Sequence, residues 1–191
     1  APLPPTATPT ATAVPATATP SPTARPAIRV TKTADTSDGM CNTDCSLREA
    51  IQAAGHGDTI VIPPVTYTSD GSAFAIDKDL TLAGSGKDST ILQAAETLDG
   101  ATHGVLKVGP SADVTISGIT IRHGKSINHG GGIYNSGMLA VTDSAVSGNE
   151  ARSYGGGIYN AGGTLSLINS IVSENTPQLG GGIYVGGNAE I

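Results

Sequence analysis

The sequence has few aromatic residues and few basic ones. Its 191 residues include no Trp and one Phe, and Tyr supplies the other five aromatic side chains. A core of large rings is therefore excluded, and Ile, Val, Leu and Ala are left to fill a closely stacked interior. Ten Lys and Arg oppose 16 acidic residues, for a formal net charge of −6. Because no cationic cluster is present to displace phosphate counterions, nucleic acid is not predicted as a partner.

Long apolar runs are also missing. No stretch of 18 apolar residues occurs, so no membrane-spanning segment is predicted. A signal peptide is not recognisable either. From these absences we expect a secreted, extracellular chain from which a leader has been removed.

Proline is scarce after residue 26, because eight of the twelve prolines lie at or before it. There they mix with Thr and Ala without hydrophobic periodicity, so residues 1–27 are predicted to form an extended polyproline II linker or stalk. Such composition is typical of O-glycosylated stalks, and an unmodified spacer is the alternative. The candidate glycosylation sites are Thr6, Thr8, Thr10, Thr12, Thr17, Thr19 and Thr23.

Cysteine is limited to Cys41 and Cys45. No second pair and no neighbouring His completes the four ligands of a structural zinc site, so neither a metal nor another cofactor is predicted. We expect a disulfide that closes a small loop, which requires an oxidising compartment. The alternative is a catalytic thiol with His56 as its base, although the spacing does not place them together.

An internal repeat dominates the second half of the chain. The sequence Gly-Gly-Gly-Ile-Tyr occurs at 130–134, 155–159 and 180–184, a spacing of 25 residues. Residues 139–149 match 165–175 at a shift of 26, and 114–124 match 139–149 at a shift of 25. At least three copies of one structural unit are therefore present.

Each unit holds three short runs of alternating residues, separated by Gly, Asn, Asp or Ser. The absence of helical periodicity excludes a leucine-rich repeat, and three strands per unit predict an all-β, right-handed parallel β-helix. Equivalent residues should stack about 4.8 Å apart, with Ile inward and Tyr outward, since buried phenols would need hydroxyl partners. The predicted ladders are the corner glycines Gly131, Gly156 and Gly181; Ile133, Ile158 and Ile183; Tyr134, Tyr159 and Tyr184; and Asn149 with Asn175.

Upstream of the repeat, strand-like runs between residues 59 and 108 predict irregular early coils, with regular coils from about 111. Residues 46–54 predict a short helix, with Ser46 as N-cap, Glu49 completing a capping box and Gly55 as the stop. Such a helix would cover the open apolar end of a solenoid. We therefore divide the chain into residues 1–27, a capping region 28–58 and a β-helix 59–191 without a carboxy-terminal cap.

The six residues Cys45–Ala50 reproduce the motif that names the CSLREA domain of secreted bacterial proteins. The segment 57–63 and the Gly-Gly-Gly-Ile-Tyr-Asn coils are similar to right-handed β-helices of the pectate-lyase-like superfold and to the repeats of polymorphic outer-membrane proteins. The resemblance covers about residues 28–191. It implies a bacterial cell-surface or secreted protein, in a superfold that also contains polysaccharide lyases and hydrolases.

An enzyme is not predicted, although a polysaccharide lyase or hydrolase stays an alternative. The tripeptide at 55–57 matches a Gly-His-Gly turn of hydrolytic members but follows the capping helix instead of lying within the coils. For a lyase, Arg122 and His123 follow a strand, yet Asp113 and Asp143 are the nearest carboxylates. These residues are predicted to be solvated surface groups.

Two binding functions are disfavoured. Ice binding needs a repeated Thr-x-Thr array, but Thr115 and Thr120 in one coil give way to Ala140 in the next. Carbohydrate stacking would have to use the Tyr ladder, since Tyr154 and the other aromatic residues are isolated in the sequence.

A structural role is the prediction that remains. The last repeat stops at residues 186–191 without a polar closing segment, and an open solenoid end is a template for another chain. We expect a non-catalytic extracellular subunit that assembles head to tail with itself into a filament or matrix, with the Tyr ladder as a lateral surface. The alternative is a cell-surface adhesin or binding fragment of a longer β-helix protein.

Overall fold

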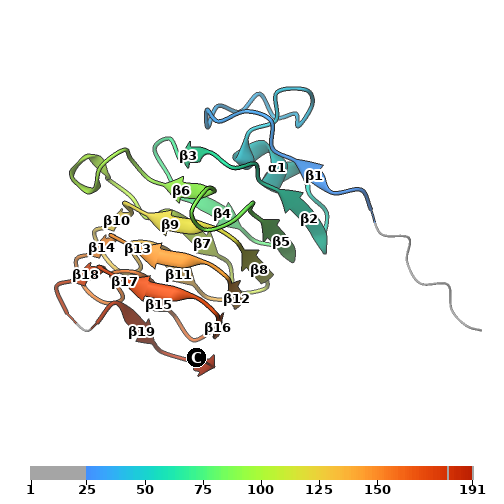
Figure 1. Ribbon diagram of the computed structural model, residues 1–191. Coiled ribbons are helices and arrows are strands. Elements are labelled where there is room, and N and C mark those ends of the chain that lie inside the picture. The colour runs from blue at the N-terminus through green and yellow to red at the C-terminus, as the bar shows by residue number, and fades with distance from the viewer. Residues whose placement is uncertain (1–24, 180, 191) are drawn as a thin grey trace, which may run out of the picture.

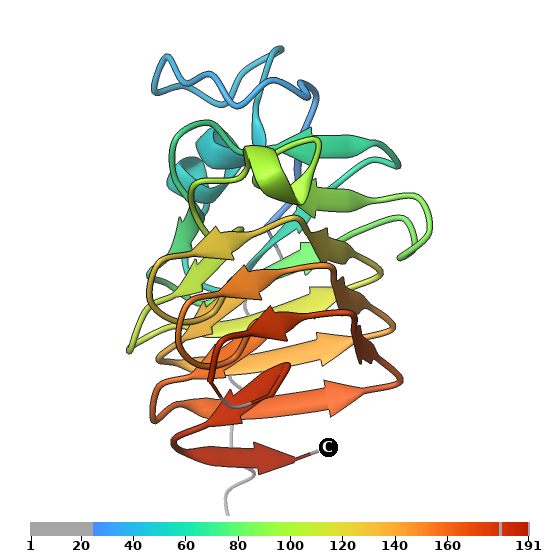
Figure 2. The ribbon, with the colours of Figure 1, turned by 90° about the vertical axis from the view of Figure 1, so that its left-hand side faces the viewer.

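The computed structural model describes residues 25–179 and 181–190, and the candidate glycosylation threonines lie outside the described residues. The described chain forms a parallel β-helix with one α-helix, which confirms the predicted fold class (Figure 1). All pairings between its strands are parallel. Successive coils therefore stack along one axis, as Figure 2 shows.

Four sheets run along the solenoid, and a regular coil passes through them in the order A, B, D and C. Sheet A consists of β1 (Ile28–Arg29), β2 (Asp58–Val61), β5 (Leu80–Ala83), β8 (Asp113–Ser117), β12 (Met138–Thr142), β16 (Thr164–Ile168) and β20 (Asn188–Glu190). Sheet B consists of β3 (Thr66–Thr68), β6 (Ile91–Gln93), β9 (Thr120–Arg122), β13 (Ala145–Ser147) and β17 (Ile171–Ser173). Sheet C consists of β4 (Phe74–Ile76), β7 (Leu106–Val108), β11 (Ile133–Asn135), β15 (Ile158–Asn160) and β19 (Ile183–Val185). Sheet D consists of β10 (Lys125–Ser126), β14 (Glu150–Ala151) and β18 (Thr176–Pro177).

Sheets A, B and C supply the three strands per coil that the sequence predicts. The strands of sheet D have two residues each, which is too short for alternation to reveal them in the sequence. The predicted early runs become β2, β4, β5, β6 and β7, while β3 and a 3₁₀ turn η1 (Leu98–Gly100) were not predicted.

The predicted ladders are in register. Ladder pairs join Ile133, Ile158 and Ile183, and beside them Tyr134, Tyr159 and Tyr184. Leu139 pairs with Leu165, a separation of 26 residues, whereas the tyrosines are 25 apart. The one extra residue near Gly162 therefore lies in a turn and does not change the register of the strands. Ile133 and Ile158 are fully buried and the tyrosines are half-buried on the outer surface, which confirms the predicted directions.

The core is a column of aliphatic side chains inside the coils. In sheet C, Phe74, Leu106 and Ile133 occupy the same position in successive strands, and all three side chains are buried. In the last described coils the inward side chains of Val172 and Ile183 are partly exposed. The core is thus better covered at the end where the chain enters the solenoid.

That end is covered by α1 (Leu47–Ala53) and the loop before it (Figure 1). The predicted capping box is present, because Ser46 and Glu49 bond to each other's backbone N–H. Leu47, Ala50 and Ile51 bury the inner face of the helix in the core. The helix ends with an extended Ala54, so Gly55 is not the left-handed stop that the sequence suggested.

The corner glycines differ from the prediction in one respect. Gly130 (φ 64°) and Gly155 (φ 62°) adopt the left-handed backbone, instead of the predicted Gly131 and Gly156. Gly131 is required for another reason, because an added Cβ would strike the carbonyl oxygen of Glu150, and a Cβ at Gly156 would lie 2.8 Å from the backbone of Thr176 in the next coil. In the third copy Gly181 itself has a φ of 60°.

Two other corners also repeat a left-handed residue in each regular coil. The register places these residues one above another directly after sheets A and B. The corner after sheet A uses Gly118, Asp143 and Asn169, and the corner after sheet B uses His123, Gly148 and Glu174, with φ between 49° and 64°. The backbone shape, and not glycine alone, is therefore what the repeat preserves.

Candidate functional site

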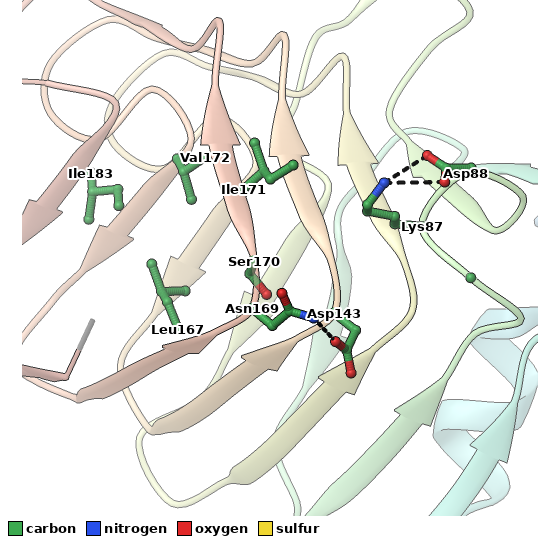
Figure 3. Close-up of a pocket in the computed structure, with 10 residues that line it drawn as sticks. Lys87, Asp88, Asp143, Leu167, Asn169, Ser170, Ile171, Val172 and Ile183 are labelled. Atoms are coloured by element: carbon green, nitrogen blue, oxygen red, sulfur yellow. Dashed lines mark hydrogen bonds and ion pairs between the residues drawn. The ribbon is translucent and has the colours of Figure 1, made fainter.

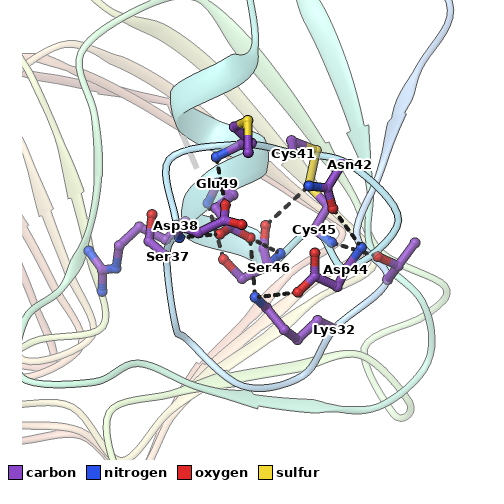
Figure 4. A network of polar contacts seen from close by, with 12 residues as sticks. Lys32, Ser37, Asp38, Cys41, Asn42, Asp44, Cys45, Ser46 and Glu49 are labelled. Atoms are coloured by element: carbon purple, nitrogen blue, oxygen red, sulfur yellow. Dashed lines mark hydrogen bonds and ion pairs between the residues drawn. A yellow bond between two sulfur atoms is a disulfide. The ribbon is translucent and has the colours of Figure 1, made fainter.

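The segment 45–50 builds the cap in which the structure concentrates its polar contacts (Figure 4). Cys41 and Cys45 form the predicted disulfide, with Cα atoms 4.4 Å apart. The buried Cys45 also pairs through its backbone with Thr31, which ties the loop to the chain that follows β1. The hydrogen bonds between Cys45 and Thr31 therefore tie the chain after β1 to the start of α1, and the disulfide closes the small loop that precedes the helix.

Glu49 is the centre of this network. Its carboxylate accepts hydrogen bonds from the backbone N–H groups of Ser46 (2.7 Å) and Asp38 (2.8 Å). These two donors lower the pKa of Glu49 to about 2, against the opposing effect of desolvation. Lys32 lies 3.5 Å from the same carboxylate. Burial alone would lower the pKa of Lys32, but Asp44 and Glu49 raise it overall.

Arg48 links the helix to the first coil. Its guanidinium binds Asp35 through two nitrogens and donates to the carbonyl oxygens of Ser72 and Ala73. It also lies over the Phe74 ring, with 5.2 Å between its Cζ and the ring centroid. Each residue of the motif therefore has a structural contact, which is sufficient to explain its presence without a ligand.

The residues considered for catalysis are not brought together. Arg122 donates to Gln93 (3.0 Å) and His123 contacts the carbonyl oxygen of Ala95, both at the corner after sheet B. Asp143 lies at a different corner, after sheet A, and accepts from Asn169. Within the described residues, no group of three His, Cys, Asp or Glu side chains is arranged to hold a metal.

His56 and Asp113 meet around Asp79 instead. The backbone N–H of Asp113 donates to Asp79 (3.0 Å), and His56 lies 3.4 Å from the other carboxylate oxygen. The first of these contacts, with help from the second, lowers the pKa of Asp79. His56 follows the carboxy-terminal end of α1, whereas Cys41 and Cys45 precede its amino-terminal end and are joined to each other, so neither sulfur is a free thiol.

A hollow of about 790 Å³ lies beside the last coils (Figure 3). Its wall contains Leu167, Val172 and Ile183, which are core side chains at the open end of the described solenoid. At its rim Lys87 pairs with Asp88, and Asn169 with Asp143. The polar groups at the rim are already bonded to each other, so they do not converge on a shared ligand.

The most distinctive surface is an aromatic column on the outer face of sheet C, made of His129, Tyr134, Tyr154, Tyr159 and Tyr184. Tyr159 lies at its centre, with ring centroids 5.4 Å from Tyr134 and 5.0 Å from Tyr184. His129 stacks on Tyr159 at 4.4 Å, and Tyr154 packs against Tyr184 at 4.8 Å. Four of the five tyrosines thus form one continuous surface.

The ladder of Tyr134, Tyr159 and Tyr184 was predicted from the sequence, but the two flanking rings were not, because Tyr154 is isolated in the sequence. His129 and Tyr154 each precede a Gly-Gly-Gly triplet, and that shared position is the signal that pairs them. Partial burial, and then the neighbouring phenols, raise the pKa of Tyr159. The phenol at the centre of the column therefore stays uncharged at neutral pH.

A threonine ladder was also missed. Thr59, Thr81 and Thr115 are paired in consecutive strands on the outer face of sheet A. The ladder gives way to Ala140 in the next coil, as the sequence indicated. Each of its three strands contributes one threonine and not a Thr-x-Thr pair, so the ladder does not form the array that ice binding needs.

The fold and its surfaces define the class: a parallel β-solenoid with a disulfide-stapled helical cap and an aromatic column on one sheet. In the described part of the chain, none of the helices is long and apolar enough to cross a membrane. A comparison with protein-family models, curated proteins and solved structures found no match to this chain. The likeness of residues 45–50 to the CSLREA motif stays a prediction.

Proposed function

We propose that this chain is a non-catalytic structural component of an extracellular, bacterial cell-surface assembly. The observation that carries the proposal is that its buried and half-buried carboxylates accept hydrogen bonds from within the fold. Asp35, Glu49, Asp58 and Asp79 each accept hydrogen bonds from arginine or backbone groups within the cap and first coils. Such carboxylates stabilise a scaffold and are not free to exchange protons with a substrate.

The Cys41–Cys45 disulfide supports an extracellular location, because cytosolic thiols are kept reduced. O-glycosylation of the Thr-rich segment belongs to the same proposal. Intact mass spectrometry of native material tests it, since a mass equal to the 18.9 kDa polypeptide would exclude glycans.

Head-to-tail assembly is the second part of the proposal. Its support is the surface formed by the last described coil, where Leu167, Val172 and Ile183 are partly exposed although they face the core. The strands of this coil also present unpaired backbone groups along one edge of each parallel sheet, which the capping region of a second copy would cover. Lateral contact along the tyrosines remains part of this hypothesis.

The test of assembly compares two lysine substitutions in β17. Val172→Lys places a charge in the inward position and should abolish concentration-dependent association in sedimentation velocity. Ile171→Lys changes the exposed neighbour on the same strand and should leave association intact. Both variants should keep the circular dichroism of the wild-type coils.

A truncation tests the contribution of the Pro/Thr segment. Removing residues 1–24 retains Arg25, whose guanidinium lies 2.8 Å from Asp58, so the first coil keeps this contact. We expect weaker association and unchanged circular dichroism. If the full and truncated chains are both monodisperse monomers at high concentration, the assembly proposal is overturned.

A further inference from the structure

A cleft of about 420 Å³ opens at one end of the aromatic column. Tyr134 and His129 form its aromatic wall, and Asp77, Lys107, Asn128 and Ser136 supply polar groups around it. The cleft lies outside the cap and the open end of the solenoid, and none of the contacts described above accounts for it. Its size is that of a small-molecule site.

The aromatic wall is exposed because the column begins here. Tyr134 packs against Tyr159 on the side of the next coil. On the side of the preceding coils its ladder neighbours are Lys107 and then Ala75, neither of which has a ring. One face of the Tyr134 ring is therefore turned to the cleft. The His129 ring also lines the cleft, and both rings pack against Tyr159. Stacking on the rings below holds both in place.

The two charged side chains of the cleft have no side-chain partners among the described residues. Asp77 and Lys107 are exposed and form neither hydrogen bonds nor ion pairs with other described side chains. This contrasts with the carboxylates of the cap, all of which are bonded. One negative and one positive group flank the rings, so these two charges offset each other.

We propose that this cleft binds a neutral pyranose unit of a glycan. The C–H groups on one face of a pyranose carry partial positive charge, which the negative face of the Tyr134 ring attracts. The hydroxyl groups at the ring edge donate to the Asp77 carboxylate and accept from the Lys107 ammonium. An acidic sugar would gain from Lys107 but be repelled by Asp77, so the pair favours a neutral unit. The inference is independent of head-to-tail assembly.

The experiment uses the full chain and three soluble neutral probes, cellohexaose, maltohexaose and hexa-N-acetylchitohexaose, with oligogalacturonate as an acidic probe. Because the protein contains no Trp, tyrosine fluorescence reports on the column directly, and titration calorimetry gives the affinity. Tyr134→Leu removes the ring of the cleft, and Tyr184→Leu is the matched control in the same ladder but outside the cleft. Asp77→Asn keeps the shape of the cleft and removes its negative charge.

We expect at least one neutral hexasaccharide to bind. Tyr134→Leu should weaken binding by about tenfold, a change in affinity that corresponds to the loss of one aromatic contact. Tyr184→Leu should leave the affinity unchanged. Asp77→Asn should weaken it by several-fold. The proposal is overturned if none of the neutral probes binds, if oligogalacturonate alone binds, or if both leucine variants lose affinity equally while keeping their thermal stability.

Discussion

At the scale of single residues, Glu49 determines how the cap responds to acid. Its folded-state pKa of about 2 lies below the ordinary value of 4.5, so the unfolded chain takes up the proton first as the pH falls. The stability that Glu49 supplies is therefore present above pH 4.5 and is lost between 4.5 and 2. Glu49→Gln should lower the melting temperature at neutral pH. Between pH 4.5 and 2 the melting temperature of this variant should fall less steeply than that of the wild type.

Thermal melts from neutral to acidic pH provide the measurement. Glu96→Gln is the control, because Glu96 is exposed and outside the network. A Glu49→Gln variant with the same acid dependence as the wild type would contradict the assignment.

The left-handed corners give a second prediction at this scale. Gly148 has a φ of 62°, and an added Cβ would meet only ordinary contacts, so the cost of a substitution there is backbone strain. Gly148→Ala should destabilise the protein by about 1 kcal/mol, and Gly148→Asn by less, since Asn tolerates this conformation. Urea unfolding measures both, with Ser147→Ala as the control in the adjacent strand. Equal losses for Ala and Asn would argue against strain as the cause.

At the scale of elements, asparagine ladders hold the turns to the coils. The side chain of Asn149 donates to the carbonyl oxygens of Ile121 and Ser147 and to Asn175, and accepts from the N–H of Gly124 (2.8 Å). Asn149→Leu leaves the buried Gly124 N–H without its partner. We expect a loss of about 2–3 kcal/mol in the free energy of unfolding.

Chemical unfolding monitored by circular dichroism tests this loss. Asn128→Ala, an exposed position, is the control and should change stability by less than about 0.5 kcal/mol. A comparably small effect of Asn149→Leu would show that water replaces the missing groups.

The same ladders show what the sequence could and could not reveal. Asn149 and Asn175 were predicted because each is the last residue of a matched run of eleven. The ladder of Asn135 and Asn160 (2.6 Å) was not, because Val185 replaces asparagine in the third copy. Likewise His129 and Tyr154 differ in type, so identity alone did not align them, although stacking requires only two flat rings. Repeated residue types therefore predict the coils. The aromatic column also depends on packing between residues of different types, which a search for repeated residues does not find.

At the scale of the whole molecule, the coil is a unit that can be removed. Deleting residues 131–155 joins Gly130 to Gly156 and removes one 25-residue period, so β15 takes the place of β11 against β7. We expect a shorter, folded solenoid with a cooperative transition and a lower melting temperature. Asn175 would then occupy the place of Asn149.

Deletion of Ser166 alone is the informative contrast. This deletion shifts part of β16 by one residue and turns Leu167 away from the core, because side chains alternate between the faces of a strand. The smaller deletion should disturb cooperative unfolding more than the loss of a whole coil. The reverse order would mean that the coils are not independent units.

The direction of the ladders also gives the molecule a mechanical anisotropy. The backbone hydrogen bonds between coils lie parallel to the solenoid axis, so a force along that axis opens them in tension, a few at a time. A force across the axis runs along the strands and must shear whole ladders together. Under lengthwise load the structure should therefore release one coil after another, each adding about 80 Å of extended chain. The solenoid would yield in steps from its last coil while the disulfide-stapled cap stays closed.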